Sequence, residues 1–317
     1  MRRETLFAVN TIYREHDNID GMYFGAGERA LAIVGALRGN EVQQLYICGQ
    51  LVKILSVYEE HGLLNDEILV IPSINSFSMN VGKRFWAVDN SDINRMFPGY
   101  DKGETTQRVA ARLFECIRGY KYGIQFTSFY MPGNFAPHAR ILDTGYHDTD
   151  LADLFGLPYV MVSSPKPVDT GTLNYNWQVF GTKAFSVYSK ETKNIHHDSA
   201  MQAIDATLNF MASVGVLKNK LGGILDGYTP VSAPLHFKED ELVNVMSSKG
   251  GIFIPKKFAG DKAAKWEVLA EVLDPYTGEL KEEIVSPTVG QIFFSYNSNL
   301  ISGHETSFRL IPQNQTL

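Results

Sequence analysis

The sequence predicts an α/β protein with a mixed, largely parallel sheet that carries helices on both faces, followed by a small all-β domain. In the first two-thirds of the 317 residues, short apolar runs alternate with amphipathic stretches, as expected when helices connect parallel strands. After residues 226–230, short strands separated by Gly and Pro turns replace this pattern. At about 150 residues per domain, the chain has room for two domains. We therefore expect an α/β domain at residues 1–226 and a β domain at residues 227–317.

Runs of apolar and β-branched residues predict the strands of the first domain, because strands that are buried on both faces lack a polar alternation. Helices are predicted where apolar residues recur every three or four positions and so share one face. In chain order these elements are a strand at 31–36, a helix at 41–61 that Gly62 ends, a strand at 68–72, a helix at 105–118, strands at 123–127, 158–163 and 184–188, and a helix at 199–216. The β domain has predicted strands at 250–255, 268–272, 283–285 and 290–294.

Composition narrows the possible partners. The 29 Lys and Arg residues against 35 Asp and Glu residues give a net charge of −6, without the basic block that nucleic acids attract. No apolar run approaches the ~20 residues of a membrane-spanning helix, and the first residues lack a signal peptide's apolar core. Cys48 and Cys116 lie within apolar helical patterns, which favours reduced thiols. We expect a cytoplasmic protein without nucleic-acid or membrane partners, and a homo-oligomer is compatible with the sequence.

The first candidate segment is GALRGNE at residues 35–41, where the first buried strand ends and a helix begins. Ligands bind at this edge of open α/β sheets. Arg38 and Glu41 are spaced to hold a carboxylate, a phosphate or a metal. In the alternative interpretation the segment is a simple turn, in which Asn40 caps the helix and Glu41 interacts with the helix dipole.

The second candidate segment is NSDINRMFPG at residues 90–99, with Asn75 and Arg84 upstream of it. It brings amide and guanidinium side chains into a long connection with little periodicity, and such ordered connections are often functional. In the alternative interpretation Arg95 pairs with Asp92, and Phe97 fills the core.

Together, GALRGNE and the later DINRMFPG resemble the succinylglutamate desuccinylase/aspartoacylase family of zinc carboxypeptidase-like deacylases. In that family the two segments read roughly GGxHGxE and DxNRxFPG. The resemblance implies a zinc carboxypeptidase-like fold and a C-terminal domain similar to a barrel-sandwich hybrid. It also implies hydrolysis of an N-acyl amino acid, with zinc bound by a His and a Glu of the first segment and by a later His, and with a further Glu as general base.

When the metal-ligand positions of the family are compared with this sequence, Glu41 is the only ligand residue that the sequence keeps. Arg38 stands at the first His position and Phe126 at the later one, in the strand at 123–127. Because Arg stays protonated in proteins and a phenyl ring offers no lone pair, neither residue can replace His as a zinc ligand. We expect Arg38 and Glu41 to form an ion pair in place of the metal.

The general-base position falls on Tyr188, or on Glu191 if a bulge shifts the register, so Glu191 is the candidate catalytic residue. The expected substrate-binding residues hold a carboxylate of a small-molecule ligand through guanidinium and amide groups. These residues are Arg38, Arg84, Asn94 and Arg95.

Histidines in two later loops offer an alternative zinc site. His138 and His147 follow one predicted strand, and His196 and His197 follow another, at the same edge of the sheet. Zinc is therefore the cofactor only if these residues rebuild the site, and otherwise we expect no cofactor.

Two functions remain open. In the first, the chain keeps a carboxylate-binding cleft for an N-acyl amino acid or a related amide and has lost hydrolysis with its zinc ligands. In the second, it is an active metal-dependent deacylase that uses displaced ligands. Whether the protein is an enzyme is left open by the sequence.

Overall fold

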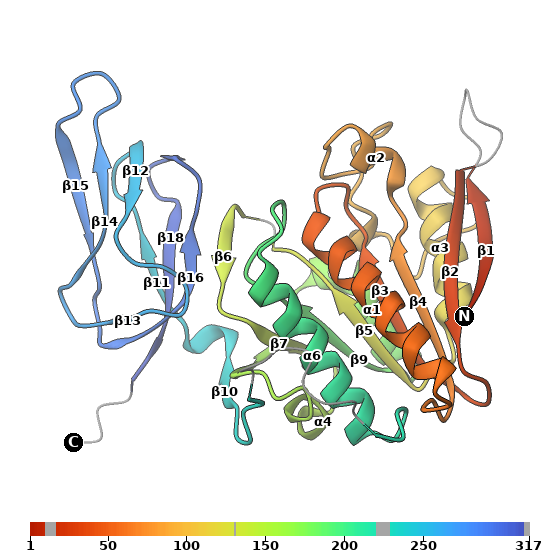
Figure 1. Cartoon of the computed structure of the whole chain (residues 1–317). Coiled ribbons are helices and arrows are strands. Elements are labelled where there is room, and N and C mark those ends of the chain that lie inside the picture. Colours follow the sequence, from red (N-terminus) through yellow and green to blue (C-terminus); the bar gives the residue numbers. More distant parts are fainter. Residues whose placement is uncertain (10–16, 130, 220–228, 314–317) are drawn as a thin grey trace.

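A nine-stranded sheet forms the larger part of the protein, and two antiparallel sheets form the C-terminal part (Figure 1). The computed structural model describes residues 1–9, 17–129, 131–219 and 229–313. The strand order of the large sheet is β1-β2-β4-β3-β5-β9-β7-β8-β10. Its strands are β1 (Arg2–Val9), β2 (Asp17–Phe24), β3 (Arg29–Ala36), β4 (Glu67–Ser73), β5 (Tyr122–Phe126), β7 (His138–Leu142), β8 (Tyr159–Ser163), β9 (Lys183–Tyr188) and β10 (Leu235–Lys238). The predicted fold class is confirmed.

Parallel pairing dominates the large sheet. Strand β3 is parallel to β4 and to β5, β5 is parallel to β9, and β8 is parallel to β7 and to β10. Strands β1 and β2 are antiparallel to each other, β2 is antiparallel to β4, and β7 is antiparallel to β9. The central strand β3 is almost continuously buried, because helices cover both of its faces.

Each face of the sheet has its own pair of helices. On one face α1 (Val42–Glu60) and α6 (His197–Ser213) lie side by side (Figure 1) and pack over Leu31 and Ile33 of β3. On the other face α3 (Thr105–Ile117) and α5 (Leu173–Val179) pack over the alternate residues Ala32 and Val34. The remaining short helices are α2 (Ser76–Asn80), α4 (Thr149–Asp153) and the 3₁₀ turns η1 (Ile93–Arg95), η2 (Pro167–Gly171) and η3 (Glu239–Glu241). No helix among the described residues combines the length and the apolar composition needed to cross a bilayer.

The C-terminal part consists of two facing sheets around a common apolar core. One sheet has the order β11-β18-β16-β13 and also receives β6, and the other has the order β15-β14-β12-β17. The strands are β6 (Gly133–Phe135), β11 (Val243–Met246), β12 (Gly251–Pro255), β13 (Lys262–Ala263), β14 (Val268–Leu273), β15 (Leu280–Val285), β16 (Gly290–Tyr296), β17 (Leu300–Ile301) and β18 (Thr306–Pro312).

Each of the two parts has one strand that pairs with the sheet of the other part. Strand β6 pairs antiparallel with β16 of the C-terminal part, whereas β10 extends the large sheet next to β8. Phe135 of β6 contacts Tyr188 and Phe293, in one aromatic cluster that both parts share. The predicted boundary between residues 226 and 227 lies outside the described residues. The pairing of β10 with the large sheet positions a residue of the site, because Glu239 directly follows β10.

Candidate functional site

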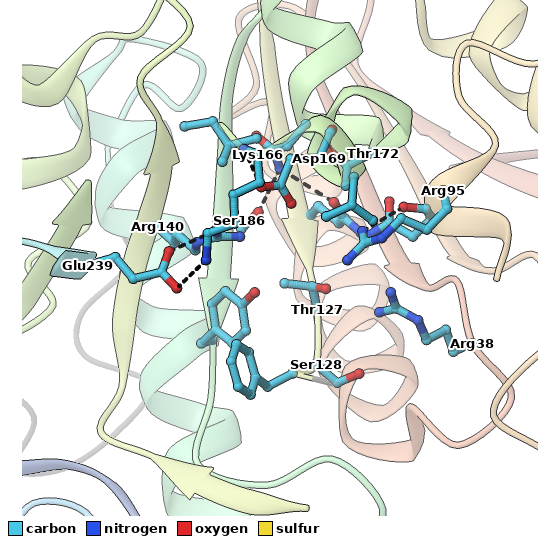
Figure 2. Close-up of a pocket in the computed structure, with 17 residues that line it drawn as sticks. Arg38, Arg95, Thr127, Ser128, Arg140, Lys166, Asp169, Thr172, Ser186 and Glu239 are labelled. Carbon is cyan, nitrogen blue, oxygen red and sulfur yellow. Dashed lines mark hydrogen bonds and ion pairs between the residues drawn. The ribbon is translucent and has the colours of Figure 1, made fainter. Parts of the chain in front are cut away.

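The two segments singled out in the sequence meet at the carboxyl ends of β3 and β5, beside a cavity of about 370 Å³ (Figure 2). Arg38 and Arg95 lie on one side of this cavity, and Arg140 and Glu239 lie on the other side, with Thr127 between them. The cavity is lined by Arg38, Asn94, Arg95, Gln125, Thr127, Ser128, Phe129, Arg140, Leu142, Lys166, Val168, Asp169, Thr172, Asn174, Ser186, Tyr188 and Glu239. The lining is therefore polar and carries more cations than carboxylates.

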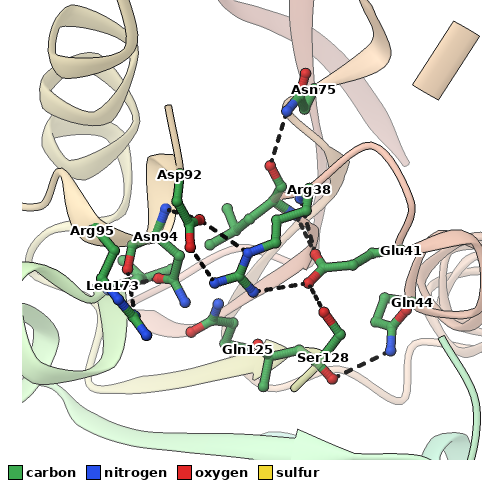
Figure 3. A network of polar contacts seen from close by, with 12 residues as sticks. Arg38, Glu41, Gln44, Asn75, Asp92, Asn94, Arg95, Gln125, Ser128 and Leu173 are labelled. Atoms are coloured by element: carbon green, nitrogen blue, oxygen red, sulfur yellow. Dashed lines mark hydrogen bonds and ion pairs between the residues drawn. The ribbon is translucent and has the colours of Figure 1, made fainter. Parts of the chain in front are cut away.

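Glu41 is fully buried, and both of its carboxylate oxygens accept hydrogen bonds (Figure 3). Oε1 accepts from Nη1 of Arg38 at 3.1 Å and from the Ser128 hydroxyl at 2.6 Å. Oε2 accepts from the backbone N–H groups of Leu37 at 2.9 Å and of Arg38 at 3.0 Å. The negative charge of Glu41 is thus compensated by the protein itself.

The remaining N–H groups of the Arg38 guanidinium form a bidentate ion pair with Asp92. Nε donates to Oδ1 and Nη2 donates to Oδ2 of Asp92, both at 2.9 Å. Burial disfavours the charged form of Arg38, but Glu41 and Asp92 outweigh it and raise the pKa of the guanidinium. Burial also disfavours the carboxylate of Asp92, but Arg38 outweighs it and lowers the pKa of this group. Arg38 therefore joins both candidate segments as a permanently charged bridge.

The simple alternatives for the two segments describe the structure only in part. Helix α1 begins at Val42 with Glu41 as its N-cap residue, and Asn40 does not cap it. Asp92 pairs with Arg38 instead of Arg95, whose Nη1 donates to the backbone oxygen of Asn94 at 2.9 Å. Phe97 is buried in the core, as the alternative predicted.

Arg95 differs from the other three cations of the cavity, each of which pairs with a carboxylate. Among the described residues, no carboxylate lies within ion-pair distance of its guanidinium. The neighbouring Asn94 is held by its Oδ1, which accepts from the backbone N–H of Leu173 at 3.0 Å. A half-buried guanidinium of this kind is suited to a ligand carboxylate.

The opposite wall of the cavity was not predicted from the sequence. Arg140 of β7 donates through Nε to the Ser163 hydroxyl at 2.9 Å and through Nη2 to Glu239 at 3.4 Å. Lys166 and Arg309 also approach Glu239, at 4.0 Å and 3.6 Å. Burial disfavours the carboxylate of Glu239, but Arg140 and the other cations outweigh it and lower its pKa. Three cations thus approach Glu239, and the carboxylate of Asp169 also acts on Arg140, so the charges that line this wall of the cavity are nearly balanced.

Two of the predicted site residues lie at a different cavity. Arg84 and Glu191 line a space of about 450 Å³, together with Asn40, Phe129 and Asn297. Burial raises the pKa of Glu191, while burial and the nearby Arg38 lower the pKa of Arg84. Because Phe129 lines both cavities, the two spaces are neighbours. The structure brings Arg38, Asn94 and Arg95 together at the first cavity, whereas Arg84 and Glu191 line the second, although Arg84 is close enough to Arg38 for its charge to be felt.

At the two later positions of the family pattern, Tyr188 lines the first cavity and Phe126 does not. Phe126 packs into the core beneath α1 and α6, and Ser128, two residues later, is the side chain that contacts Glu41. Tyr188 stacks on the ring of His138, with centroids 4.6 Å apart and planes at 7°. The residue next to Glu41 is therefore Ser128, which the sequence pattern did not single out.

The histidines of the later loops have structural contacts of their own. His138 is buried in the aromatic cluster, and burial lowers its pKa to about 3. His196 accepts from the backbone N–H of Ser199 at the start of α6, and His147 lies 3.1 Å from Asp143. Among the residues that the structure describes, no three His, Cys, Asp or Glu side chains are grouped as a metal site.

The sequence of the α/β part matches the model of a known family. Residues 28–214 match the model of the succinylglutamate desuccinylase/aspartoacylase catalytic domain. A search of curated proteins gave no significant match.

Several solved structures share the fold over nearly the whole chain. The ectoine utilization protein EutE from Ruegeria pomeroyi, solved with bound product, has a TM-score of 0.77 at 17% identity, over 94% of this chain and 90% of that one. A succinylglutamate desuccinylase/aspartoacylase from Rhodobacter sphaeroides has a TM-score of 0.78 at 16% identity, over 95% and 90% of the two chains. An aspartoacylase family protein from Mesorhizobium loti has a TM-score of 0.73 at 18% identity, over 95% and 91%.

Proposed function

The chain belongs to the succinylglutamate desuccinylase/aspartoacylase family, and from this we propose that it binds an N-acyl amino acid, or a related amide, through the ligand's carboxylate and without zinc-dependent hydrolysis. The ion pair of Arg38 with Glu41 is the observation that carries this proposal. In this function the protein requires no cofactor.

Zinc does not fit the donor set around Glu41. Zinc ligands are neutral imidazoles, thiolates or carboxylates with a free lone pair. Both oxygens of Glu41 already accept two hydrogen bonds each, and Arg38 contributes a fixed positive charge next to them. A dication would have to displace Arg38 from Glu41 and would still face its guanidinium, which remains bound to Asp92.

The lining of the first cavity supports an anionic ligand. Its volume of about 370 Å³ lies within the range of small-molecule sites. Arg95 offers its guanidinium on one wall, and Arg140 and Lys166 both pair with Glu239 on the other. The cations of the lining outnumber its carboxylates, and Arg95 is the one that pairs with no carboxylate among the described residues, so we expect Arg95 to bind the ligand's carboxylate.

The alternative function, a metal-dependent deacylase with displaced ligands, would use the second cavity. Glu191 lines that cavity, and its pKa is raised by burial, as is typical of a general base that works near neutral pH. A metal there would have to recruit ligands other than those the family uses.

Calorimetry on the purified protein distinguishes the two functions. We expect N-succinyl-L-glutamate or N-acetyl-L-aspartate to bind, and their fully amidated forms to bind at least about tenfold more weakly, because a charged hydrogen-bonded pair contributes roughly 1.5–3 kcal/mol. Arg95→Gln should weaken binding to a similar extent, and Arg112→Gln on the exposed face of α3 is the matched control. Stoichiometric zinc in the protein, together with amide hydrolysis that a chelator abolishes, would establish the deacylase instead.

A further inference from the structure

Two buried carboxamides on the floor of the first cavity are incompletely hydrogen-bonded. Gln125 of β5 is 2% exposed and Asn174 of α5 is 3% exposed, and both line the cavity. Nε2 of Gln125 and Oδ1 of Asn174 have no hydrogen-bond partner among the described residues. Leaving a buried polar group unpaired costs roughly 1–3 kcal/mol, so such a pair at a cavity wall is available for hydrogen bonds to a ligand in the cavity.

The contacts between the two side chains determine what they present. Nδ2 of Asn174 donates to Oε1 of Gln125 at 3.4 Å and to the Ser186 hydroxyl at 2.8 Å. The free atoms are therefore the amide nitrogen of Gln125, which carries two N–H donors, and the oxygen acceptor of Asn174. Exchanging nitrogen and oxygen in both carboxamides again leaves a free donor beside a free acceptor, with the roles of the two residues reversed, because the hydrogen bond between them couples the two orientations.

A donor beside an acceptor matches the C=O and N–H of a secondary amide. We propose that Gln125 and Asn174 form an amide clamp that recognises the intact amide bond of the ligand, with Gln125 donating to its carbonyl oxygen and Asn174 accepting from its N–H. The clamp rests on the proposed function and makes the expected ligand more specific. A free amino acid, which remains after the amide is cleaved, has no secondary amide whose C=O and N–H the two residues could bind.

One hydrogen bond joins the segment of Arg95, the expected carboxylate-binding residue, to the segment of Asn174. Asn94, next to Arg95, accepts from the N–H of Leu173, and Leu173 precedes Asn174. Gln125 also lies beneath the guanidinium of Arg38, between Asn94 and Ser128 (Figure 3). In an N-acyl amino acid only the α-carbon separates the carboxylate from the amide nitrogen, so a site that recognises both groups needs neighbouring binding residues.

The test compares an amide with its ester analogue by calorimetry. In O-succinyl-2-hydroxyglutarate, an ester oxygen replaces the amide N–H of N-succinyl-L-glutamate, and the carboxylates are unchanged. We expect the ester to bind the wild-type protein roughly tenfold more weakly, because its oxygen faces the acceptor of Asn174. The same pair derived from N-acetyl-L-aspartate serves as a second probe.

Variants connect this preference to the two residues. Gln125→Leu and Asn174→Leu should each weaken amide binding roughly tenfold, and Asn174→Leu should abolish the preference over the ester. Thr207→Val is the control, because its buried hydroxyl donates to the backbone oxygen of Ala203 within α6, away from the cavity lining. Circular dichroism checks the fold of each variant, and the wild-type comparison does not depend on any of them.

The outcomes separate the two proposals. Equal affinity for amide and ester in the wild-type protein overturns the clamp, while a preference for the carboxylate forms over the amidated forms still supports the proposed function. If neither N-succinyl-L-glutamate nor N-acetyl-L-aspartate binds, both the proposed function and the amide clamp are wrong.

Discussion

Replacing Arg38 by Met tests whether a fixed cation holds the buried acidic residues of the site in place. The guanidinium forms ion pairs with Glu41, which is 0% exposed, and with Asp92, which is partly exposed. Removing one partner of a buried ion pair costs about 3–5 kcal/mol. Glu41 keeps its bonds to Ser128 and to two backbone N–H groups, and water reaches Asp92, so we expect a loss of about 3 kcal/mol at pH 7.

The pH dependence gives the same prediction a distinctive signature. Because Arg38 lowers the pKa of Asp92 in the folded protein, the ionised Asp92 stabilises the fold above its unfolded pKa of about 3.9. That contribution is lost as the pH falls through the lower, folded pKa. The Arg38→Met variant lacks it at every pH, so the difference in unfolding free energy between the two proteins should shrink as the pH falls below about 4.

Urea denaturation followed by circular dichroism at pH 7 and at pH 3 measures both effects. The control is Arg112→Met, which removes an exposed pair with Glu115 at 3.8 Å and should change stability by less than about 0.5 kcal/mol. The double variant Arg38→Met/Glu41→Gln should recover part of the loss, because no charge then remains buried at position 41. An Arg38→Met variant as stable as the control at pH 7 would refute the reasoning, as would a difference that does not change with pH.

Three further predictions concern neighbouring contacts. Ser128→Ala should lower the free energy of unfolding by about 1.5–3 kcal/mol, because the hydroxyl donates to a buried carboxylate, and no loss in urea denaturation would contradict this. The double variant Arg38→His/Ser128→His should bind zinc measurably in calorimetry, because residues 38 and 128 both contact Glu41 and would place two imidazoles beside it. The variant Arg38→His/Phe126→His should not bind zinc, because Phe126 lies in the core. Phe135→Ala should cost about 3–5 kcal/mol and should destabilise both parts of the fold in hydrogen exchange, since its ring lies in their shared cluster. Exchange that increases in only one part would contradict that shared role.

The elements with strong local patterns were predictable. The helix predicted at 41–61 is α1 (Val42–Glu60), and the strand predicted at 31–36 is β3 (Arg29–Ala36). A helical period and a continuous apolar run are both patterns of consecutive residues, so these elements can be recognised without knowing any distant contact. Strands β6 and β10 were missed because each is short and gains its stability from a partner far along the chain, β16 for β6 and β8 for β10.

The site was predictable on one side only. The motifs identified Arg38, Glu41, Asn94 and Arg95, and these residues meet at the sheet edge that the α/β pattern predicts. Arg140 and Glu239 of the opposite wall belong to unpredicted elements and carry no motif. Gln125 did offer a signal, because Gln125 and Thr127 are polar at alternating positions of the apolar strand predicted at 123–127, and such positions share one face.

The sequence by itself determined the α/β class, the succession of its main elements and the two segments that carry the family resemblance. Only the tertiary structure decided that Arg38 binds Asp92, 54 residues away, as well as Glu41, and that Arg84 and Glu191 line a separate cavity. The physical reason is that periodicity acts between near neighbours, whereas the partner of a buried charge depends on the strand order that brings distant loops to one edge of the sheet.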